Sequence, residues 1–185
     1  KSIGIQIEKN DPKIKKLLNE VKDREFIGYS YDGADASFEL LARRLMGDIP
    51  RYILINEYDV SVKKDIDGEI ISHAKAQLEV DGQKILCEGQ GNGPVNALDN
   101  AIRKNVNKLA KYSEYLKDLK LVDYKVRILN TGTEAVTRVS IESTDSKGVN
   151  WFTIGVSPNI IEASFKALVD SLDYKLFKDK APASL

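Results

Sequence analysis

Few residues in this sequence have the chemistry of a catalytic or metal-binding group. Cys87 and His73 are the only cysteine and histidine, so one chain cannot form a disulfide or a Cys/His zinc site. Histidine catalysis would depend on His73 alone, in a run of alternating polarity where a solvent-facing or structurally bonded histidine is expected. Carboxylates such as Asp32 and Asp99 form no paired arrangement. The sequence therefore predicts no catalytic residue, metal site or cofactor within this chain.

Two glycine-containing stretches could instead bind an anion. Gly91-Asn92-Gly93-Pro94 and Gly155-Val156-Ser157-Pro158 each follow a β-rich run and precede a helical pattern. Unpaired N–H groups and the helix dipole favour a carboxylate or phosphate at a helix start. Residues 89–93 lack the Lys-Ser/Thr of a phosphate-binding loop and have the wrong spacing for a dinucleotide fingerprint. On spacing alone, a glycine-rich turn without a ligand is an equally good interpretation.

If the carboxylate of a ligand bound at the first helix start, the β-rich run that follows could contact the remainder of that ligand. That run offers Leu121, either Tyr124 or Lys125, and either Ile128 or Arg127. Strand alternation places Leu121 and Tyr124 on opposite faces unless a bulge intervenes. On the pattern alone, ordinary core packing is the favoured interpretation of these apolar residues.

Length and composition limit the class of protein. The chain has 185 residues, 28 Lys+Arg against 28 Asp+Glu, and 42% hydrophobic residues, which fits one globular domain, or one domain with a helical appendage. Neutral net charge argues against nucleic-acid or anionic-membrane partners, and neither a membrane span nor a signal peptide is predicted. Because the chain begins at Lys1, we expect a piece of a longer protein.

Helical spacing predicts two helices near the start of the chain. Asp11 as N-cap and Pro12 at the first helical position predict a helix over about residues 12–25. A second helix is expected to stop at Gly47. Its apolar face carries Phe38, Leu41 and Leu45.

The period of the apolar pattern then changes to two. Three β-rich runs are predicted over residues 52–63, 69–80 and 84–90. The turn dipeptides Asp67-Gly68 and Asp81-Gly82 separate them. A long amphipathic helix follows, with its apolar face running from Val95 to Leu109.

The same order of elements returns in the second half. Three β-rich runs are predicted over residues 121–129, 135–143 and 149–156, and a second long helix runs from Ile160 toward Tyr174. We therefore predict an α+β fold, with a short helical subdomain followed by two β-β-β-α units related by a pseudo-twofold. Two unrelated α+β halves that share a helix-start signal are the alternative.

Three motifs carry a resemblance to a known family. They are Gly91 to Ala97, Leu121 to Leu129, and Gly155-Val156-Ser157 followed by Asn159 to Ser164. Together they resemble the C-terminal regulatory domain of the 2-isopropylmalate synthase and citramalate synthase family. Residues Gly33 to Leu41 are similar to the small helical subdomain that precedes this domain.

The resemblance implies a division of the chain. Residues 1–49 would form the helical linker subdomain and residues 50–185 the regulatory domain, with one unit over about 50–114 and another over about 119–178. Leu121 to Leu129 and Asp170 to Leu176 resemble the citramalate branch more than the isopropylmalate branch.

The resemblance also implies a function. Enzymes of this family are cytoplasmic acyltransferases that condense acetyl-CoA with a 2-oxo acid on a catalytic barrel, which would hold the divalent metal and is absent from this chain. This chain would be an inactive, homodimeric regulatory region that binds isoleucine for feedback inhibition. Alternatives are a leucine-binding region of a 2-isopropylmalate synthase, and a dimerisation module without a ligand.

The effector site implied by the family involves the starts of both long helices and the strand between them. The chemistry is suitable, because an amino-acid carboxylate favours helix N–H groups and its branched side chain favours an apolar pocket. The matching positions are Asn92, Gly93, Val95, Asn96, Leu121, Tyr124, Ile128, Ala135, Thr137, Pro158 and Ile160.

Overall fold

The computed structural model describes residues 11–129 and 135–184. The chain divides into two compact bodies. The first contains the described residues up to Ile49, Leu121–Thr144 and Val149–Tyr174. The second contains Pro50–Lys120, Asp145–Gly148 and the described residues from Lys175 onward.

The helical segment at the start of the first body matches its prediction. Helix α1 spans Pro12–Phe26, and the N–H of Lys13 donates to the Asp11 side chain at 2.8 Å. Helix α2 spans Asp35–Met46 and ends at Gly47, whose φ of 79° is the left-handed conformation of a glycine C-cap. The two helices contact each other.

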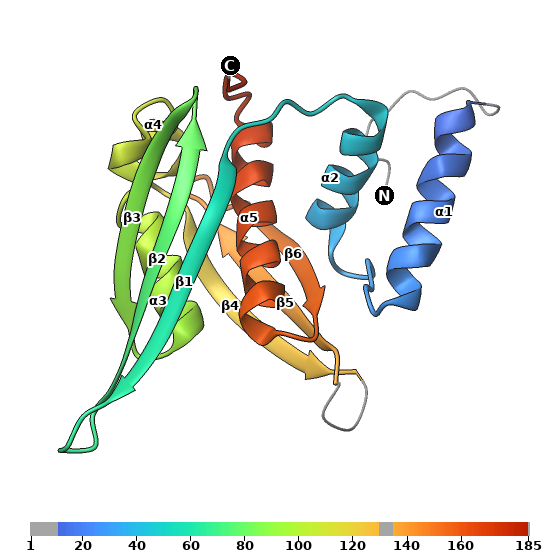
Figure 1. Cartoon of the computed structure of the whole chain (residues 1–185). Coiled ribbons are helices and arrows are strands. Elements are labelled where there is room, and N and C mark those ends of the chain that lie inside the picture. The colour runs from blue at the N-terminus through green and yellow to red at the C-terminus, as the bar shows by residue number, and fades with distance from the viewer. Residues whose placement is uncertain (1–10, 130–134, 185) are drawn as a thin grey trace. The chain divides into compact units, whose positions relative to one another are not determined.

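The second body contains the first three-stranded sheet and its helix. Strands β1 (Leu54–Lys64), β2 (Ile70–Val80) and β3 (Gln83–Gly91) pair antiparallel in the order β1-β2-β3. Alternate residues of β2 are buried on one face, and helix α3 (Pro94–Arg103) covers this sheet (Figure 1). A 3₁₀ turn, η1 (Val106–Leu109), and the short helix α4 (Ser113–Leu116) follow.

The two Asp-Gly dipeptides form different turns. Asp81-Gly82 is a two-residue hairpin turn in which both φ angles are positive, at 51° and 72°, as a type I′ turn requires. Asp67-Gly68 lies in a longer connection between Lys64 and Ile70. The Asp65 side chain closes this loop by accepting from two backbone N–H groups at 2.9 Å.

The prediction of one long helix through Leu109 is wrong. Helix α3 ends at Arg103, and Asn105 provides the physical reason. The Asn105 side-chain amide donates to the carbonyl of Ala101 at 2.7 Å and to the carbonyl of Glu88 on β3 at 2.9 Å. The backbone N–H of Asn105 instead donates to Ile102, three residues back. The side chain thus takes the carbonyl that a continuing helix would use.

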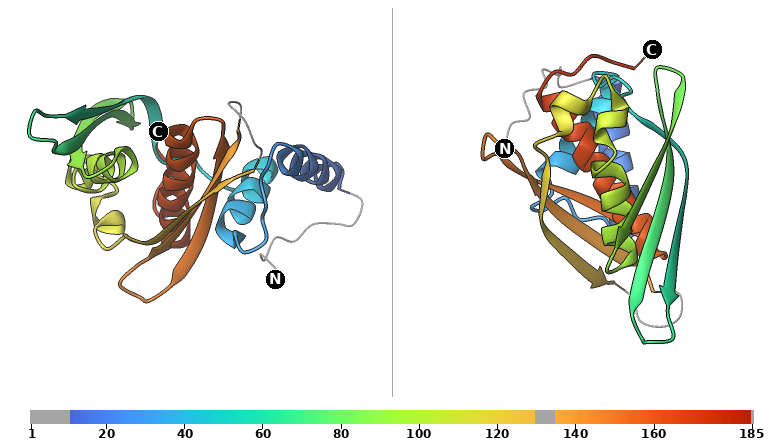
Figure 2. Two further views of the ribbon diagram at one scale, coloured as in Figure 1. Left: turned by 90° about the horizontal axis from the view of Figure 1, so that it is seen from below. Right: turned by 90° about the vertical axis from the view of Figure 1, so that its left-hand side faces the viewer.

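The second sheet and most of its helix belong to the first body. Strands β4 (Lys120–Ile128), β5 (Thr137–Thr144) and β6 (Asn150–Ser157) form a sheet in that order. Helix α5 (Ile160–Lys178) lies against this sheet, as the red helix in Figure 2 shows. Trp151 of β6 is buried and donates to Ser171 of α5 at 3.2 Å, so it packs between this sheet and its helix.

Both repeats use the same contact between the third strand and the helix. A Cβ on Gly89 would lie 2.3 to 2.7 Å from backbone atoms of Ala97 and Ala101, and one on Gly155 would lie 1.9 to 3.0 Å from those of Ala163 and Ala167. In each repeat the two alanines follow the glycine by the same spacing. The duplicated unit is therefore real, and the α+β prediction of two β-β-β-α units behind a helical segment is confirmed.

The shared contact shows that Gly91-Asn92-Gly93-Pro94 and Gly155-Val156-Ser157-Pro158 are not equivalent segments of the two repeats. Pro94 is the first residue of α3, whereas Pro158 lies two residues before α5 begins at Ile160. Gly155 therefore corresponds to Gly89, and Asn159 corresponds to Gly93. The two proline motifs resemble each other in sequence but hold different positions relative to their helices.

Candidate functional site

Tyr124 connects β4 to the first turn of α5. Its hydroxyl lies 2.9 Å from Ser164 Oγ, and Ser164 Oγ donates to the carbonyl of Ile160 at 2.6 Å. Because the serine proton is used on Ile160, the tyrosine hydroxyl donates to the serine. Burial raises the pKa of Tyr124, so the hydroxyl stays protonated at neutral pH. The structure thus brings together Tyr124 and Ile160, two of the predicted site residues.

The other predicted residues of this body differ in exposure. Leu121 is half-buried and, by alternation, lies on the face of β4 opposite to Tyr124. Ile128 is 71% exposed. Thr137 is buried at the start of β5 and pairs with Ser157 of β6, the residue that precedes Pro158. Ala135 is half-buried and precedes β5.

The start of α5 already has a side-chain cap. Asn159 Oδ1 accepts from the N–H groups of Ile161 at 2.8 Å and Glu162 at 3.3 Å. These are two of the N–H groups that an anion would need. The start of α5 is therefore less available to a carboxylate than its sequence pattern indicates.

The start of α3 lacks such a cap. Its N-cap is Gly93, which has no side chain, and Pro94 has no N–H. Asn96 Oδ1 accepts from the N–H of Asn92 at 3.3 Å and from Asn100 at 3.4 Å. Val95 is half-buried, whereas Asn92 and Asn96 are exposed. Within the part of the chain that the structure describes, the first-turn N–H groups of α3 have no side-chain acceptor at the cap.

A polar clasp between α2 and α5 was not predicted from the sequence. Arg44 donates to Asp170 and to Asp173, both at 2.8 Å. Ser37 donates to Asp170 at 2.9 Å and accepts from the N–H of Ile154 on β6 at 2.9 Å. The acidic pair has the i, i+3 spacing of one helix face, but its partner lies more than a hundred residues earlier in the chain.

The polar clasp consists of Ser37, Arg44, Asp170 and Asp173. Of these residues, Asp173 has a carboxylate whose charged form is disfavoured by its surroundings. Burial raises the pKa of Asp173 to about 6, against the opposing charge of Arg44 and with a further rise from the charge of Asp170. Asp173 Oδ1 is buried without a hydrogen-bond partner in the described part of the chain. One arginine thus serves two carboxylates that repel each other.

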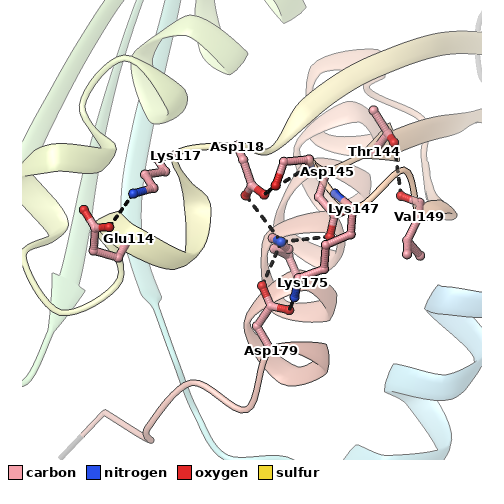
Figure 3. A network of polar contacts seen from close by, with 10 residues as sticks. Glu114, Lys117, Asp118, Thr144, Asp145, Lys147, Val149, Lys175 and Asp179 are labelled. Carbon is pink, nitrogen blue, oxygen red and sulfur yellow. Dashed lines mark hydrogen bonds and ion pairs between the residues drawn. The ribbon is translucent and has the colours of Figure 1, made fainter.

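A second cluster lies in the second body around Lys175 (Figure 3). The Lys175 side chain is 2% exposed, and its ammonium lies 2.7 Å from Asp179, 2.9 Å from Asp145 and 3.3 Å from Asp118. Lys147 pairs with Asp179 at 2.6 Å. Although burial opposes the charged form, the hydrogen bonds that Lys175 donates to Asp179 and Asp145 hold its pKa well above its usual range. Because the amine stays protonated, it cannot act as a base or nucleophile, and the cluster is structural.

Among the residues that the structure describes, no group of three or more His, Cys, Asp and Glu side chains is placed to hold a metal ion. Of the helices formed by residues 11–129 and 135–184, none combines the length and the apolar character that crossing a membrane requires.

Comparison with known proteins gives the family. The model of the LeuA allosteric (dimerisation) domain matches residues 32–176. The (R)-citramalate synthase of Aquifex aeolicus is 45% identical over 183 residues, which cover 97% of this chain and 34% of that protein. The (R)-citramalate synthase of Geobacter sulfurreducens is 42% identical over 96% of this chain and 33% of its own length. The 2-isopropylmalate synthase of Burkholderia multivorans is 35% identical over 58% of this chain and 19% of its own length.

The fold defines the class as an α+β module in which one sheet-and-helix unit occurs twice behind a helical segment. The chain belongs to the LeuA allosteric (dimerisation) domain family. It spans about a third of the length of the citramalate synthases that it matches. The family resemblance noted in the sequence is therefore confirmed.

Proposed function

We propose that this chain is the regulatory region of a citramalate synthase and that it binds isoleucine for feedback inhibition. The observation that carries the proposal is the similarity to (R)-citramalate synthases over 97% of the chain, within a family described as allosteric. The parent enzyme would be a cytoplasmic acyltransferase that condenses acetyl-CoA with pyruvate in isoleucine biosynthesis. This chain alone would have no catalytic activity.

Each part of the chain has its own role in this function. Residues 1–49 are the helical linker subdomain, and residues 50–185 are the regulatory domain, with units over about 50–114 and about 119–178. The regulatory domain would also form the homodimer.

Each body, taken by itself, contains proposed site residues whose chemistry suits an amino acid. The uncapped start of α3, at Gly93, Val95 and Asn96, suits the carboxylate, because its first-turn N–H groups have no side-chain acceptor at the cap in the described part of the chain. Tyr124 and Ile160 offer ring and aliphatic surface for a branched side chain, and Ile160 is 42% exposed.

Calorimetric titration of the chain with isoleucine and with leucine tests the proposal. We expect isoleucine to bind more tightly. Tyr124→Ala removes the ring and its hydrogen bond to Ser164, and we expect it to raise the Kd for isoleucine by at least about tenfold. Tyr115→Ala, at a half-buried tyrosine of α4 in the other body, is the matched control and should leave the Kd within about twofold. In the parent enzyme, Tyr124→Ala should abolish inhibition.

Two other experimental results would each support a different function for this chain. Tighter binding of leucine would favour the isopropylmalate branch, which matches 58% of the chain. A pocket that tells two such isomers apart gains only about 1–3 kcal/mol, so both titrations are needed. No heat with either amino acid, and full inhibition of the parent enzyme after Tyr124→Ala, would favour a dimerisation module without a ligand, a role that the family description also names.

A further inference from the structure

The first body contains a cavity of about 300 Å³ that is separate from the contact between Tyr124 and Ser164. It lies between the loop that connects α1 to α2 and the polar side chains of β4 and β5. Its wall includes Ser30, Asp32, Lys125, Arg127, Arg138 and Ser140. We call it the basic pocket. Its three cations outnumber its one carboxylate.

The two arginines of the basic pocket lack the partners that arginines usually have. Arg127 has no ion pair or hydrogen bond to any residue that the structure describes, and among the same residues the Arg138 side chain donates only to the carbonyl of Gly28, at 2.6 Å. Partial burial lowers the pKa of Arg138, and the charge of Arg127 lowers it further. Two cations that line one cavity repel each other, so an anion between them would be stabilised.

The other charged groups of the basic pocket do not cancel its net positive charge. Lys125 pairs with Asp123 at 2.6 Å, so this lysine is already balanced by a carboxylate outside the wall. Asp32 offsets one of the two arginines and leaves the other. The hydroxyls of Ser30 and Ser140 add neutral donors that suit an oxyanion.

We propose that the basic pocket binds a small doubly charged oxyanion, a phosphate or a dicarboxylate, between Arg127 and Arg138. The guanidinium group is the side chain best suited to either ligand, because its N–H donors match two oxygens of a carboxylate or phosphate. The bound anion would connect the loop before α2 to the sheet, since Arg138 already holds that loop through Gly28. The site is independent of the isoleucine site.

The proposal is tested by NMR titration of the ¹⁵N-labelled chain with sodium phosphate and, separately, with sodium succinate, at constant ionic strength in chloride. We expect saturable shifts of the Ser30 and Ser140 amides with at least one of the two probes. Arg127→Gln, at an exposed residue, should weaken that binding by about tenfold. Arg51→Gln, an exposed arginine outside the pocket, is the matched control and should leave the binding unchanged.

The outcomes separate the two sources of the anion. Saturation by phosphate alone identifies a phosphate group, and saturation by succinate alone identifies a dicarboxylate. Shifts that never saturate with either probe would overturn the proposal. So would an affinity that Arg127→Gln leaves intact, or one that Arg51→Gln weakens equally, because the binding would then be non-specific charge attraction.

Discussion

At the scale of the residue, Asp173 makes the stability of the chain depend on pH. Its carboxyl titrates at about 6 in the folded state, against an ordinary value of 3.8. The folded state therefore keeps this proton at pH values where the unfolded chain has lost it. Stability from this group is fully present below about pH 4 and is lost as the pH rises to about 6.

We predict that Asp173→Asn removes the loss of folding stability that the Asp173 carboxyl causes as the pH rises. The variant should gain stability relative to the native chain as the pH rises from about 4 to about 6, by on the order of 3 kcal/mol in total. Arg44 keeps Asp170 as its partner in the variant, so the clasp is retained. Urea denaturation of both proteins at several pH values measures the difference.

The exposed Asp48 supplies the control for this experiment. Asp48→Asn should give a stability curve parallel to that of the native chain, because this side chain is exposed on the surface. Parallel curves for Asp173→Asn and the native chain would instead mean that Asp173 ionises normally.

At the scale of the element, each sheet depends on one glycine for its contact with a helix. We predict that Gly155→Ala destabilises the chain by about 3 kcal/mol or more, because the new methyl group would overlap the backbone carbonyl of Ala163. Gly89→Ala should have a similar effect in the other body, where Ala101 is the obstacle. Denaturant unfolding measures both.

Gly93→Ala is the matched control for these glycines. No atom lies within 4 Å of a Cβ placed there, and its φ of −156° is accessible to alanine. The cost should stay below about 1 kcal/mol. Equal losses in all three variants would show that the effect comes from the loss of glycine flexibility and not from helix packing.

Helix α5 combines several roles along its length. Its first turn receives the Tyr124 contact through Ser164, and Asp170, further along, receives Ser37 and Arg44 of α2. The helix that starts at the proposed effector residues therefore also holds the helical segment of the first body.

At the scale of the whole molecule, the family description predicts self-association. We expect a mass near twice the 20.7 kDa of one chain in light scattering, and a melting temperature that rises with protein concentration. Exposed apolar side chains on the edge strand β4, at Val122, Val126 and Ile128, fit a surface that a partner covers. A monomeric mass and a melting temperature independent of concentration would contradict this prediction.

The sequence alone determined the elements of this protein and their order. Caps such as Asp11 and Gly47, the change of period from 3.6 to 2 and the repeated strand-and-helix order depend on neighbouring residues, so a linear pattern contains them. The linear pattern gave a wrong helix end where one side chain competes with the backbone, because the Asn105 amide binds the Ala101 carbonyl at the end of α3. A family resemblance also predicts Tyr124 and Ile160 as site residues, and this stays a prediction; the sequence did not indicate Ser164, which hydrogen-bonds to both.

Only the tertiary structure decided which charges meet. Arg44 and Asp170 are 126 residues apart, and Arg138 reaches a carbonyl 110 residues away. Lys175 gathers acids from three separate segments. Charged side chains carry no periodic signal that names their partner, because an exposed and a buried ion pair use the same residues. The clasp, the Lys175 cluster and the basic pocket therefore exist only once the chain has folded.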